Sequence, residues 1–194
     1  MNDGYSEVPP GKLANVVTYL EMRTPKAIAT SATVEFVVRR VERPDLDWYR
    51  NLYRRVGEDW LWFSRLRMRD EELRKILHDP AVDLHVLSYA GEDRGFLEFD
   101  CRSMPDIEIA FFGVTKEMIG KGAGRALMAQ GLQNAWAHKP ERIWVHTCTS
   151  DHPSALAFYQ KIGFVAYRRA VEIADDPRIT GELPRTTASH VPVL

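Results

Sequence analysis

The stretch EMIGKGAGRALMAQGLQNAWA, residues 117–137, places three glycines at alternate positions directly before a helical pattern. Apolar side chains recur at helical spacing from Leu127 to Trp136, so we expect a helix here. The first N–H groups of a helix lack intrahelical partners and lie at the positive end of its dipole. Glycine lets the backbone approach an anion and adopt positive φ, so the stretch predicts an anion-binding turn. The alternative is tight helix–sheet packing, which also favours glycine.

Two cations, Lys121 and Arg125, stand at the same end of the expected helix. Both are unfavourable for the helix dipole, which indicates that an anion is expected there. The dinucleotide fingerprint G-x-G-x-x-G and the phosphate-loop pattern G-x-x-x-x-G-K-[ST] do not fit the spacing of the glycines. Nicotinamide cofactors and nucleoside triphosphates are therefore disfavoured.

The rest of the chain alternates strand and helix patterns around this stretch. Strands are expected at residues 14–22, 34–41, 82–90, 94–102, 106–114, 142–148 and 164–173. Helices are expected after Pro44, with Asp70 as a cap, after the glycine turn and over residues 153–163, where Pro153 occupies the first turn. Residues 58–68 look aromatic and irregular, and the last twenty residues read as a tail. This order predicts an α/β or α+β protein with one central sheet.

Composition excludes several classes of protein. With 194 residues and 45% hydrophobic content, the chain suits one domain. A net charge of −1 does not indicate nucleic-acid binding. Two cysteines favour a reducing compartment. No signal pattern is seen, and no apolar run approaches the roughly 20 residues of a membrane span, so we expect a cytoplasmic protein without a membrane partner.

The segment GVTKEMIGKGAGRALM resembles the acetyl-CoA-binding segment of the GCN5-related N-acetyltransferases (GNAT). The usual pattern there is [Q/R]-x-x-G-x-[G/A]. Gly122 and Gly124 match it, whereas Ile119 stands where Arg or Gln is usual. The loss of that polar side chain shifts pyrophosphate binding to backbone N–H groups, Lys121 and Arg125.

A second segment, HPSALAFYQKIGF (residues 152–164), is similar to the later family pattern N-x-x-A-x-x-F-Y-x-K-x-G-F. Its alanine, both aromatic residues, lysine, glycine and final phenylalanine match. His152 occupies the usual Asn position, which is a second departure. Together the two segments cover residues 106–164.

The resemblance implies a mixed, mostly antiparallel sheet of about seven strands with about four flanking helices. Two neighbouring parallel strands, residues 106–114 and 142–148, would splay apart. We expect residues 1–30 to be an N-terminal extension with a possible extra strand, residues 31–175 to be the acetyltransferase domain and residues 176–194 to be a C-terminal tail.

The same resemblance implies that acetyl-CoA is a co-substrate and lies in the splay between the parallel strands. Its pantetheine arm would pair with the main chain like an added strand, and its pyrophosphate would sit on the glycine turn. The residues assigned to the cofactor are Phe112, Gly113, Val114, Gly120, Lys121, Gly122, Ala123, Gly124, Arg125, His152 and Ala155.

Two residues are assigned to catalysis. Tyr159 matches the family tyrosine that hydrogen-bonds the CoA sulfur and can protonate it, and the alternative is a packed tyrosine. Glu108 lies among apolar neighbours on the cofactor strand, so it is a candidate general base. The alternative for Glu108 is a buried ion pair. Rival bases are Glu98, Asp100, His146 and Asp151.

Other polar and aromatic clusters carry weaker hypotheses. The spacing in HTCTSDH, residues 146–152, matches no zinc pattern, so no metal is expected. Cys148 lacks a positioned base and is not a candidate nucleophile. The rings of Trp60, Trp62 and Phe63 either shape an acceptor pocket or belong to the core.

The sequence therefore predicts an N-acetyltransferase that moves the acetyl group of acetyl-CoA to a primary amine by direct attack. The acceptor would be a small-molecule or peptide amine, and a homodimer is possible. One alternative is an acyl-CoA-binding sensor that no longer catalyses, which the departures at Ile119 and His152 keep open. Another is a partner-binding domain on the same fold.

Overall fold

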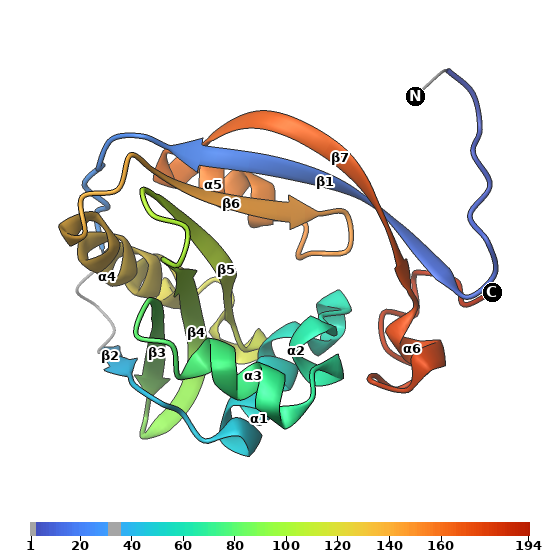
Figure 1. The fold of residues 1–194 in the computed structure, drawn as a ribbon, viewed down its shortest axis with the longest axis horizontal. Coiled ribbons are helices and arrows are strands. Elements are labelled where there is room, and N and C mark those ends of the chain that lie inside the picture. The colour runs from blue at the N-terminus through green and yellow to red at the C-terminus, as the bar shows by residue number, and fades with distance from the viewer. Residues whose placement is uncertain (1–2, 31–35) are drawn as a thin grey trace.

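A single sheet of seven strands organises the computed structural model, which describes residues 3–30 and 36–194 (Figure 1). The strand order is β2-β3-β4-β5-β6-β1-β7, and every neighbouring pair is antiparallel except β5–β6. The strands are β1 (Lys12–Met22), β2 (Val37–Val41), β3 (Val82–Tyr89), β4 (Glu92–Asp100), β5 (Asp106–Val114), β6 (Arg142–Cys148) and β7 (Val165–Asp175). This confirms the predicted mixed, mostly antiparallel sheet.

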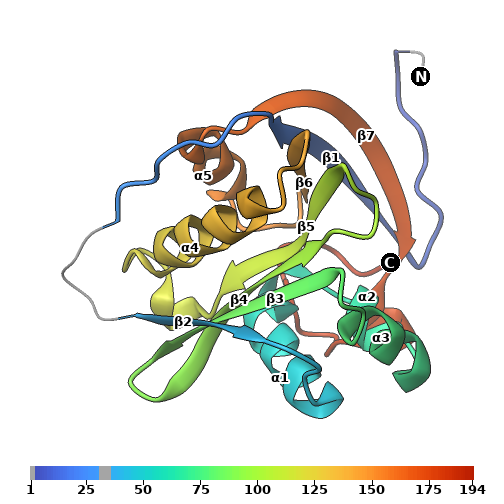
Figure 2. The same ribbon diagram turned by 60° about the vertical axis from the view of Figure 1, so that its left-hand side comes forward.

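Helices cover both faces of the sheet (Figure 2). They are α1 (Leu46–Gly57), α2 (Ser64–Arg67), α3 (Asp70–Leu77), α4 (Ala123–Ala137), α5 (Ala155–Ile162) and α6 (Pro177–Thr180), with short 3-10 turns η1 (Glu58–Trp60) and η2 (Lys116–Met118). The apolar stripes of α4 and α5 pack on one face of the central strands, and those of α1 and α3 pack on the other face of β3 and β4. None of the described helices combines the length and apolarity that a membrane crossing requires.

The parallel pair β5–β6 is joined over only part of its length. Pairing runs from Asp106 opposite Arg142 to Ile109 opposite Val145 and then stops, although both strands continue. On its other side, β5 pairs with β4 up to Val114, with a bulge at Ala110. A bulge bends and twists a strand, so the second half of β5 turns away from β6. The predicted splay lies at this point.

The strand expected in residues 14–22 is β1, and it lies inside the sheet between β6 and β7. Its pairing with β7 runs from Lys12 opposite Asp175 to Glu21 opposite Val165. Residues 12–22 therefore supply an inner strand to the sheet formed by the rest of the chain. The domain boundaries after residues 30 and 175 stay predictions.

The last twenty residues, expected to be a tail, fold around one arginine. The side chain of Arg178 is fully buried and donates to both carboxylate oxygens of Asp176 and to the carbonyls of Thr187 and Val191. Leu183 packs in a small core with Leu13 of β1 and Leu61. This segment therefore supports the chain just after η1.

Several local expectations differ from the structure. The residue before the first turn of α3 is Arg69, and Asp70 is the first helical residue. Helix α5 begins at Ala155, so Pro153 lies outside its first turn. Residues 58–68, expected to be irregular, contain η1 and the single turn α2. The start of the strand expected at residues 34–41 falls partly outside the described residues.

Candidate active site

The glycine turn takes the conformation that only glycine adopts easily. Gly120 and Gly122 have φ of 79° and 86°, and a Cβ added at either position would meet no atom within 4 Å. Gly122 is the N-cap of α4, without a side-chain capping bond. The N–H groups of the first turn, which follow Gly122, have no intrahelical acceptors. The turn therefore presents backbone donors and the positive end of α4 to open space.

Gly124 has a different role within the same turn. It lies inside α4, and an added Cβ would approach Phe112 Cζ to 3.3 Å and Phe158 Cε2 to 3.9 Å. The two phenylalanine rings stack at 5.2 Å between centroids. Helix–sheet packing, the alternative interpretation for the glycines, therefore applies to Gly124, whereas backbone conformation explains the other two.

A cleft of about 820 Å³ opens where β5 and β6 separate. Its walls include the glycine turn, the second half of β5, the end of β6 and the start of α5. Within the described chain, the pairing of β5 with β6 stops at Ile109, so the N–H and C=O groups on the β6 side of residues 110–114 face this cleft. The sequence-predicted residues that line it are Glu108, Phe112, Gly113, Val114, Gly120, Gly122, Gly124, Arg125, His152, Ala155 and Tyr159; Lys121 and Ala123 adjoin it.

Tyr159 reaches the cleft from α5 and is 6% exposed. Its ring packs against Phe112 and Phe164, at 6.1 and 5.8 Å between centroids. Burial, aided by the charge of Asp151, raises the pKa of the Tyr159 phenol well above its ordinary value. The hydroxyl therefore remains protonated over the physiological pH range. No hydrogen bond to it occurs within the described part of the chain.

Asp151 ties the end of β6 to the aromatic wall of the cleft. One carboxylate oxygen accepts bonds from Thr147 Oγ1 at 2.7 Å and from the Cys148 N–H at 2.9 Å, and the other accepts from Trp62 Nε1 at 3.1 Å. Trp62 in turn lies over Gly113, where an added Cβ would be 3.4 Å from its ring. The tryptophan therefore shapes the cleft directly above β5.

His152, which replaces the family Asn, fixes the turn before α5. Its Nδ1 accepts from the Ser154 N–H at 3.0 Å, and its carbonyl accepts from the Ala155 N–H at 2.8 Å. Its ring meets Trp60 edge-on at 4.8 Å between centroids. His152 thus links the start of α5 to η1 across the cleft.

Glu108 and His146 lie on neighbouring strands with 3.6 Å between Glu108 Oε1 and His146 Nδ1, and they form an ion pair when His146 is protonated. Interaction with the Glu108 carboxylate raises the pKa of His146 above its ordinary value, against the opposing effect of burial. Glu108 is part-exposed rather than enclosed by apolar neighbours, and its partner is a histidine, not an arginine. Both side chains line the cleft.

The profile of the family described as "Acetyltransferase (GNAT) domain" matches residues 58–175, more than half of the chain. The chain belongs to the GNAT acetyltransferase family. Members of this family use an acyl-CoA donor. In this GNAT protein the residues that the sequence predicted to bind that donor lie together at the cleft beside the glycine turn.

Solved structures support the fold of this GNAT protein. A functionally unknown conserved protein from Staphylococcus epidermidis has a TM-score of 0.63 at 15% identity, over 86% of this chain and 64% of its own. An aminoglycoside acetyltransferase from an uncultured soil metagenomic sample scores 0.58 at 20%, over 71% and 93%. AAC(6')-Iy, in complex with a CoA-containing bisubstrate analog, scores 0.54 at 17%, over 70% and 95%. Such identities show the fold alone. No curated protein gives a significant sequence match.

Two rival bases of the GNAT protein are already bound to cationic side chains. Glu98 is fully buried and binds Arg65 and the Tyr49 hydroxyl, both at 2.5 Å. Asp100 binds Arg102, and this hydrogen bond lowers the pKa of the Asp100 carboxyl. Glu98 therefore has a structural role, and Asp100 is a weak base.

We expect Glu98→Ala to lower the free energy of unfolding by about 3–5 kcal/mol, because it leaves the Arg65 charge buried without its partner. Urea unfolding followed by circular dichroism measures this. The matched control is the double variant Arg65→Met with Glu98→Leu, which removes both charges and should recover most of the loss. Equal losses in the two variants would contradict the ion-pair account.

The structure also bears on Cys148 and on the groups of side chains that could bind a metal. Burial raises the pKa of the Cys148 thiol to about 11, so the thiol is protonated at neutral pH. Among residues 3–30 and 36–194, no three or more histidine, cysteine, aspartate or glutamate side chains gather as metal ligands.

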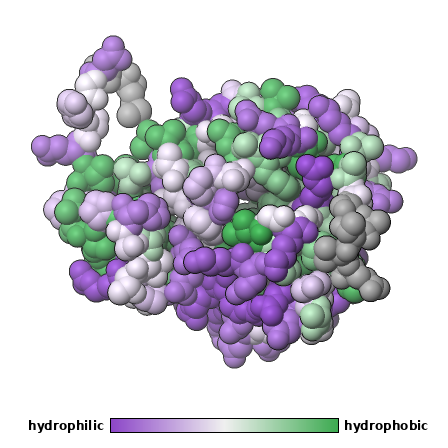
Figure 3. Space-filling view, turned by 180° about the vertical axis from the view of Figure 1, so that it is seen from behind, coloured by the Kyte–Doolittle hydropathy of each residue, from purple (hydrophilic) through white to green (hydrophobic). Residues whose placement is uncertain are grey.

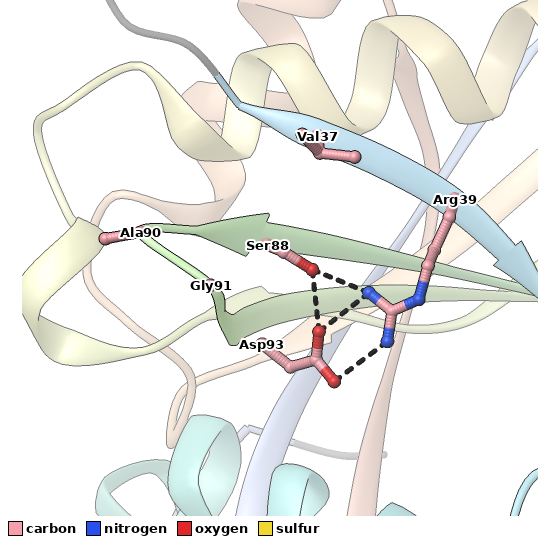
Figure 4. A pocket seen from close by; sticks show the side chains of 6 residues that line it. All are labelled: Val37, Arg39, Ser88, Ala90, Gly91 and Asp93. Atoms are coloured by element: carbon pink, nitrogen blue, oxygen red, sulfur yellow. Dashed lines mark hydrogen bonds and ion pairs between the residues drawn. The ribbon is translucent and has the colours of Figure 1, made fainter.

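A second, smaller hollow of about 480 Å³ lies at the turn between β3 and β4 and is lined by residues of β2, β3, β4 and this turn (Figure 4). Arg39 of β2 lines this hollow and donates hydrogen bonds to Ser88 and to both carboxylate oxygens of Asp93. The polar side chains of this hollow are thus bonded to one another. The cleft between β5 and β6 is the candidate active site.

Sequence reasoning gave Asp151 no structural role and left Trp62 undecided. The hydrogen bond from Trp62 to Asp151 joins residues 89 positions apart, and no local sequence pattern predicts such a contact. The available signal was indirect, because three aromatic residues in four positions near η1 exceed what a surface segment needs. Trp60, Trp62 and Phe63 all line the cleft.

Proposed function

We propose that this GNAT protein transfers the acetyl group of acetyl-CoA to a primary amine by direct attack. The observation that carries the proposal is the meeting of three features in one cleft. These are the unpaired second half of β5, the open N-terminus of α4 and the buried hydroxyl of Tyr159. Each is a feature that a thioester donor with a pyrophosphate group would need.

The residues around the cleft fit acetyl-CoA. The pyrophosphate would be held by the N–H groups of residues 122–125 at the positive end of α4, assisted by the side chains of Lys121 and Arg125. Ile119 is 40% exposed and offers no polar group, so backbone donors have the larger share. The pantetheine amides would pair with the free edge of residues 112–114, with His152 and Ala155 on the opposite wall.

Neutral His146, paired with the Glu108 carboxylate, would accept the proton of the attacking amine. A protonated amine has no lone pair, so a base in the cleft must deprotonate it. Because Glu108 raises the pKa of His146, the imidazole is a stronger base than an isolated histidine. In this proposal His146 takes the proton, and Glu108 stabilises the imidazolium, as the carboxylate does in catalytic triads.

Tyr159 would donate a hydrogen bond to the sulfur of the leaving thiolate. Free thiols have a pKa of about 8.5, well below the raised pKa of this phenol. Complete proton transfer from Tyr159 would therefore be uphill, whereas a hydrogen bond that strengthens as charge develops is favourable. The protein contributes a donor that is buried and already oriented.

The acceptor half of the cleft favours a cationic small molecule with a flat or apolar part. Four carboxylates line the cleft: Asp100, Glu108, Asp151 and Glu172. Asp100 binds Arg102 and Glu108 pairs with His146, so Asp151 and Glu172 supply the negative charge that would attract a cation. The aromatic rings of Trp60, Trp62, Phe63 and Phe111 also line the cleft. Cations are attracted both to carboxylates and to aromatic faces. One structural relative is an aminoglycoside acetyltransferase, whose name agrees with a small-molecule amine.

A pH profile of Glu108→Gln tests the proposed base. Removing the carboxylate removes the main cause that raises the pKa of His146, so its pKa falls. The base form of His146 then persists to lower pH, and the acidic limb of kcat/KM should move to lower pH. Above this limb we expect about tenfold lower kcat/KM, because the weaker imidazole is a poorer base. An unmoved limb, or loss of activity at every pH, would contradict the role of His146.

Release of free thiol from acetyl-CoA in a panel of amines tests the reaction itself. The panel would contain aminoglycosides, polyamines and a lysine peptide. We expect release that depends on a small cationic amine and on the intact glycine turn. Binding of acetyl-CoA without release for any amine would instead support the non-catalytic sensor.

A further inference from the structure

Strand β7 is an exposed sheet edge of unusual length. It has eleven residues, ends the strand order and, in the part of the chain that the structure describes, pairs only with β1. All but one of its residues are exposed. Its free N–H and C=O groups form a template for another strand, which proteins normally shorten, cover or interrupt. This edge is therefore available to pair with a further strand.

The side chains along this edge mix apolar groups with opposite charges. Val171 and Ile173 of β7 and the neighbouring Val16 of β1 are 44%, 52% and 44% exposed. Figure 3 shows hydrophilic and hydrophobic side chains mixed along the upper rim of the molecule. Arg168 and Glu172 lie four positions apart, about 13 Å along an extended strand, so they are too distant to pair with each other.

We propose that β7 pairs antiparallel with β7 of a second copy of this chain, about a two-fold axis at Ala170. In this register Arg168 lies opposite Glu172 of the partner subunit, and Glu172 lies opposite the partner's Arg168. Two cross-strand pairs of opposite charge result from one symmetric contact. Val171 then approaches its symmetry mate diagonally, which covers part of the exposed apolar group.

The neighbouring registers are disfavoured by the same charges. In antiparallel strands, the side chains of two directly opposite residues lie on the same face of the sheet. A two-fold axis normal to the sheet must therefore pass midway between a residue and the same residue of the partner strand. Centring on Arg169 or on Glu172 would place that charge against itself. Centring on Val171 would set Glu172 opposite Ala170 and leave the charges unmatched. The bulge at Tyr167, between Ala166 and Arg168 in the pairing with β1, limits regular pairing to residues 168–172.

The charges in this contact specify the register more than they add affinity. Exposed ion pairs contribute little stability. Like charges that would lie opposite each other in another register destabilise that register. The main-chain hydrogen bonds of the joined edges and the apolar side chains supply the attraction. This contact concerns assembly and does not depend on the proposed reaction. Glu172 also lines the cleft, so its variants are judged by assembly and not by activity.

Disulfide trapping in the full chain tests the register. Directly opposite Cα atoms of antiparallel strands are about 4.5–5.5 Å apart, within the range that a disulfide spans. We expect Ala170→Cys to form a covalent dimer under mild oxidation. Ile173→Cys is the matched control, since it is exposed on the same strand but would lie roughly 20 Å from its symmetry mate. No cross-link at position 170, or equal cross-linking at 173, would overturn the proposal.

A charge exchange, read by light scattering over a range of protein concentrations, tests the contact independently. Arg168→Glu and Glu172→Arg each create like-charge pairs and should shift the population from dimer to monomer. The double variant restores opposite charges and should restore the dimer. Circular dichroism shows whether each variant is folded. A monomeric natural chain, single variants that stay dimeric, or a double variant that stays monomeric would each contradict the register.

Discussion

Gly122→Glu should weaken acetyl-CoA binding at least about 100-fold, which corresponds to about 2.8 kcal/mol. Gly122 is the N-cap of α4 at φ 86°, where the backbone donors of the cleft begin. A carboxylate at this position would repel the pyrophosphate and occupy the space it needs. Because an added Cβ meets no atom within 4 Å, the variant should fold. Calorimetric titration with acetyl-CoA measures the change in affinity.

Backbone strain is the other effect of this substitution, and Gly91→Glu controls for it. Gly91 has φ of 80°, open space around an added Cβ and a position in the turn between β3 and β4. A side chain with positive φ costs of order 1–3 kcal/mol of stability at either site. Only the change at residue 122 should alter acetyl-CoA affinity. Equal losses in both variants would trace the effect to stability, and unchanged affinity at 122 would remove the glycine turn from the site.

Tyr159→Phe should lower kcat by about 10²–10³ while changing acetyl-CoA affinity less than threefold. The substitution removes only the hydroxyl and retains the ring that packs on Phe112 and Phe164. If the hydroxyl stabilises the departing thiolate, the loss appears only in the transition state, so kcat and kcat/KM fall together. Steady-state kinetics with the best amine acceptor, together with calorimetry, separate the two effects.

The matched control for this variant is Tyr167→Phe, which removes the hydroxyl of a half-exposed tyrosine on β7, outside the residues that line the cleft. Its turnover should stay within about twofold of the natural protein. Thermal unfolding verifies that both variants are folded. A Tyr159→Phe protein with normal kcat would mean that water or another group serves the thiolate.

The sequence predicted those parts of the fold that depend on local patterns. Alternating β-branched residues predicted β5 and β6, and the glycine turn predicted the start of α4, because neighbouring residues determine each of them. The sheet order needed more information. β1 is inserted between β6 and β7, although more than 120 residues separate Val17 from its partner Cys148. No local pattern specifies which strands of similar composition become neighbours.

The candidate site shows the same division. Tyr159 and the glycines were found because they lie in continuous motifs, whereas the partners of the acidic residues were not. The pairing of Glu98 with Arg65 and of Glu108 with His146 depends on strands and helices that meet only after folding. Arg178 illustrates the limit most clearly. A polar C-terminal sequence predicted a tail, yet one buried guanidinium organises it through carbonyls up to thirteen residues away.

Acetyl-CoA binding at the glycine turn is the interaction on which the proposed function depends most directly. Calorimetric titration of the natural chain with acetyl-CoA, beside Gly122→Glu and Gly91→Glu, measures this in one experiment. We predict one-site micromolar binding to the natural chain and to Gly91→Glu, and no measurable binding to Gly122→Glu. Absence of binding to the natural chain, or equal binding to all three proteins, would contradict the assignment of the cleft to acetyl-CoA.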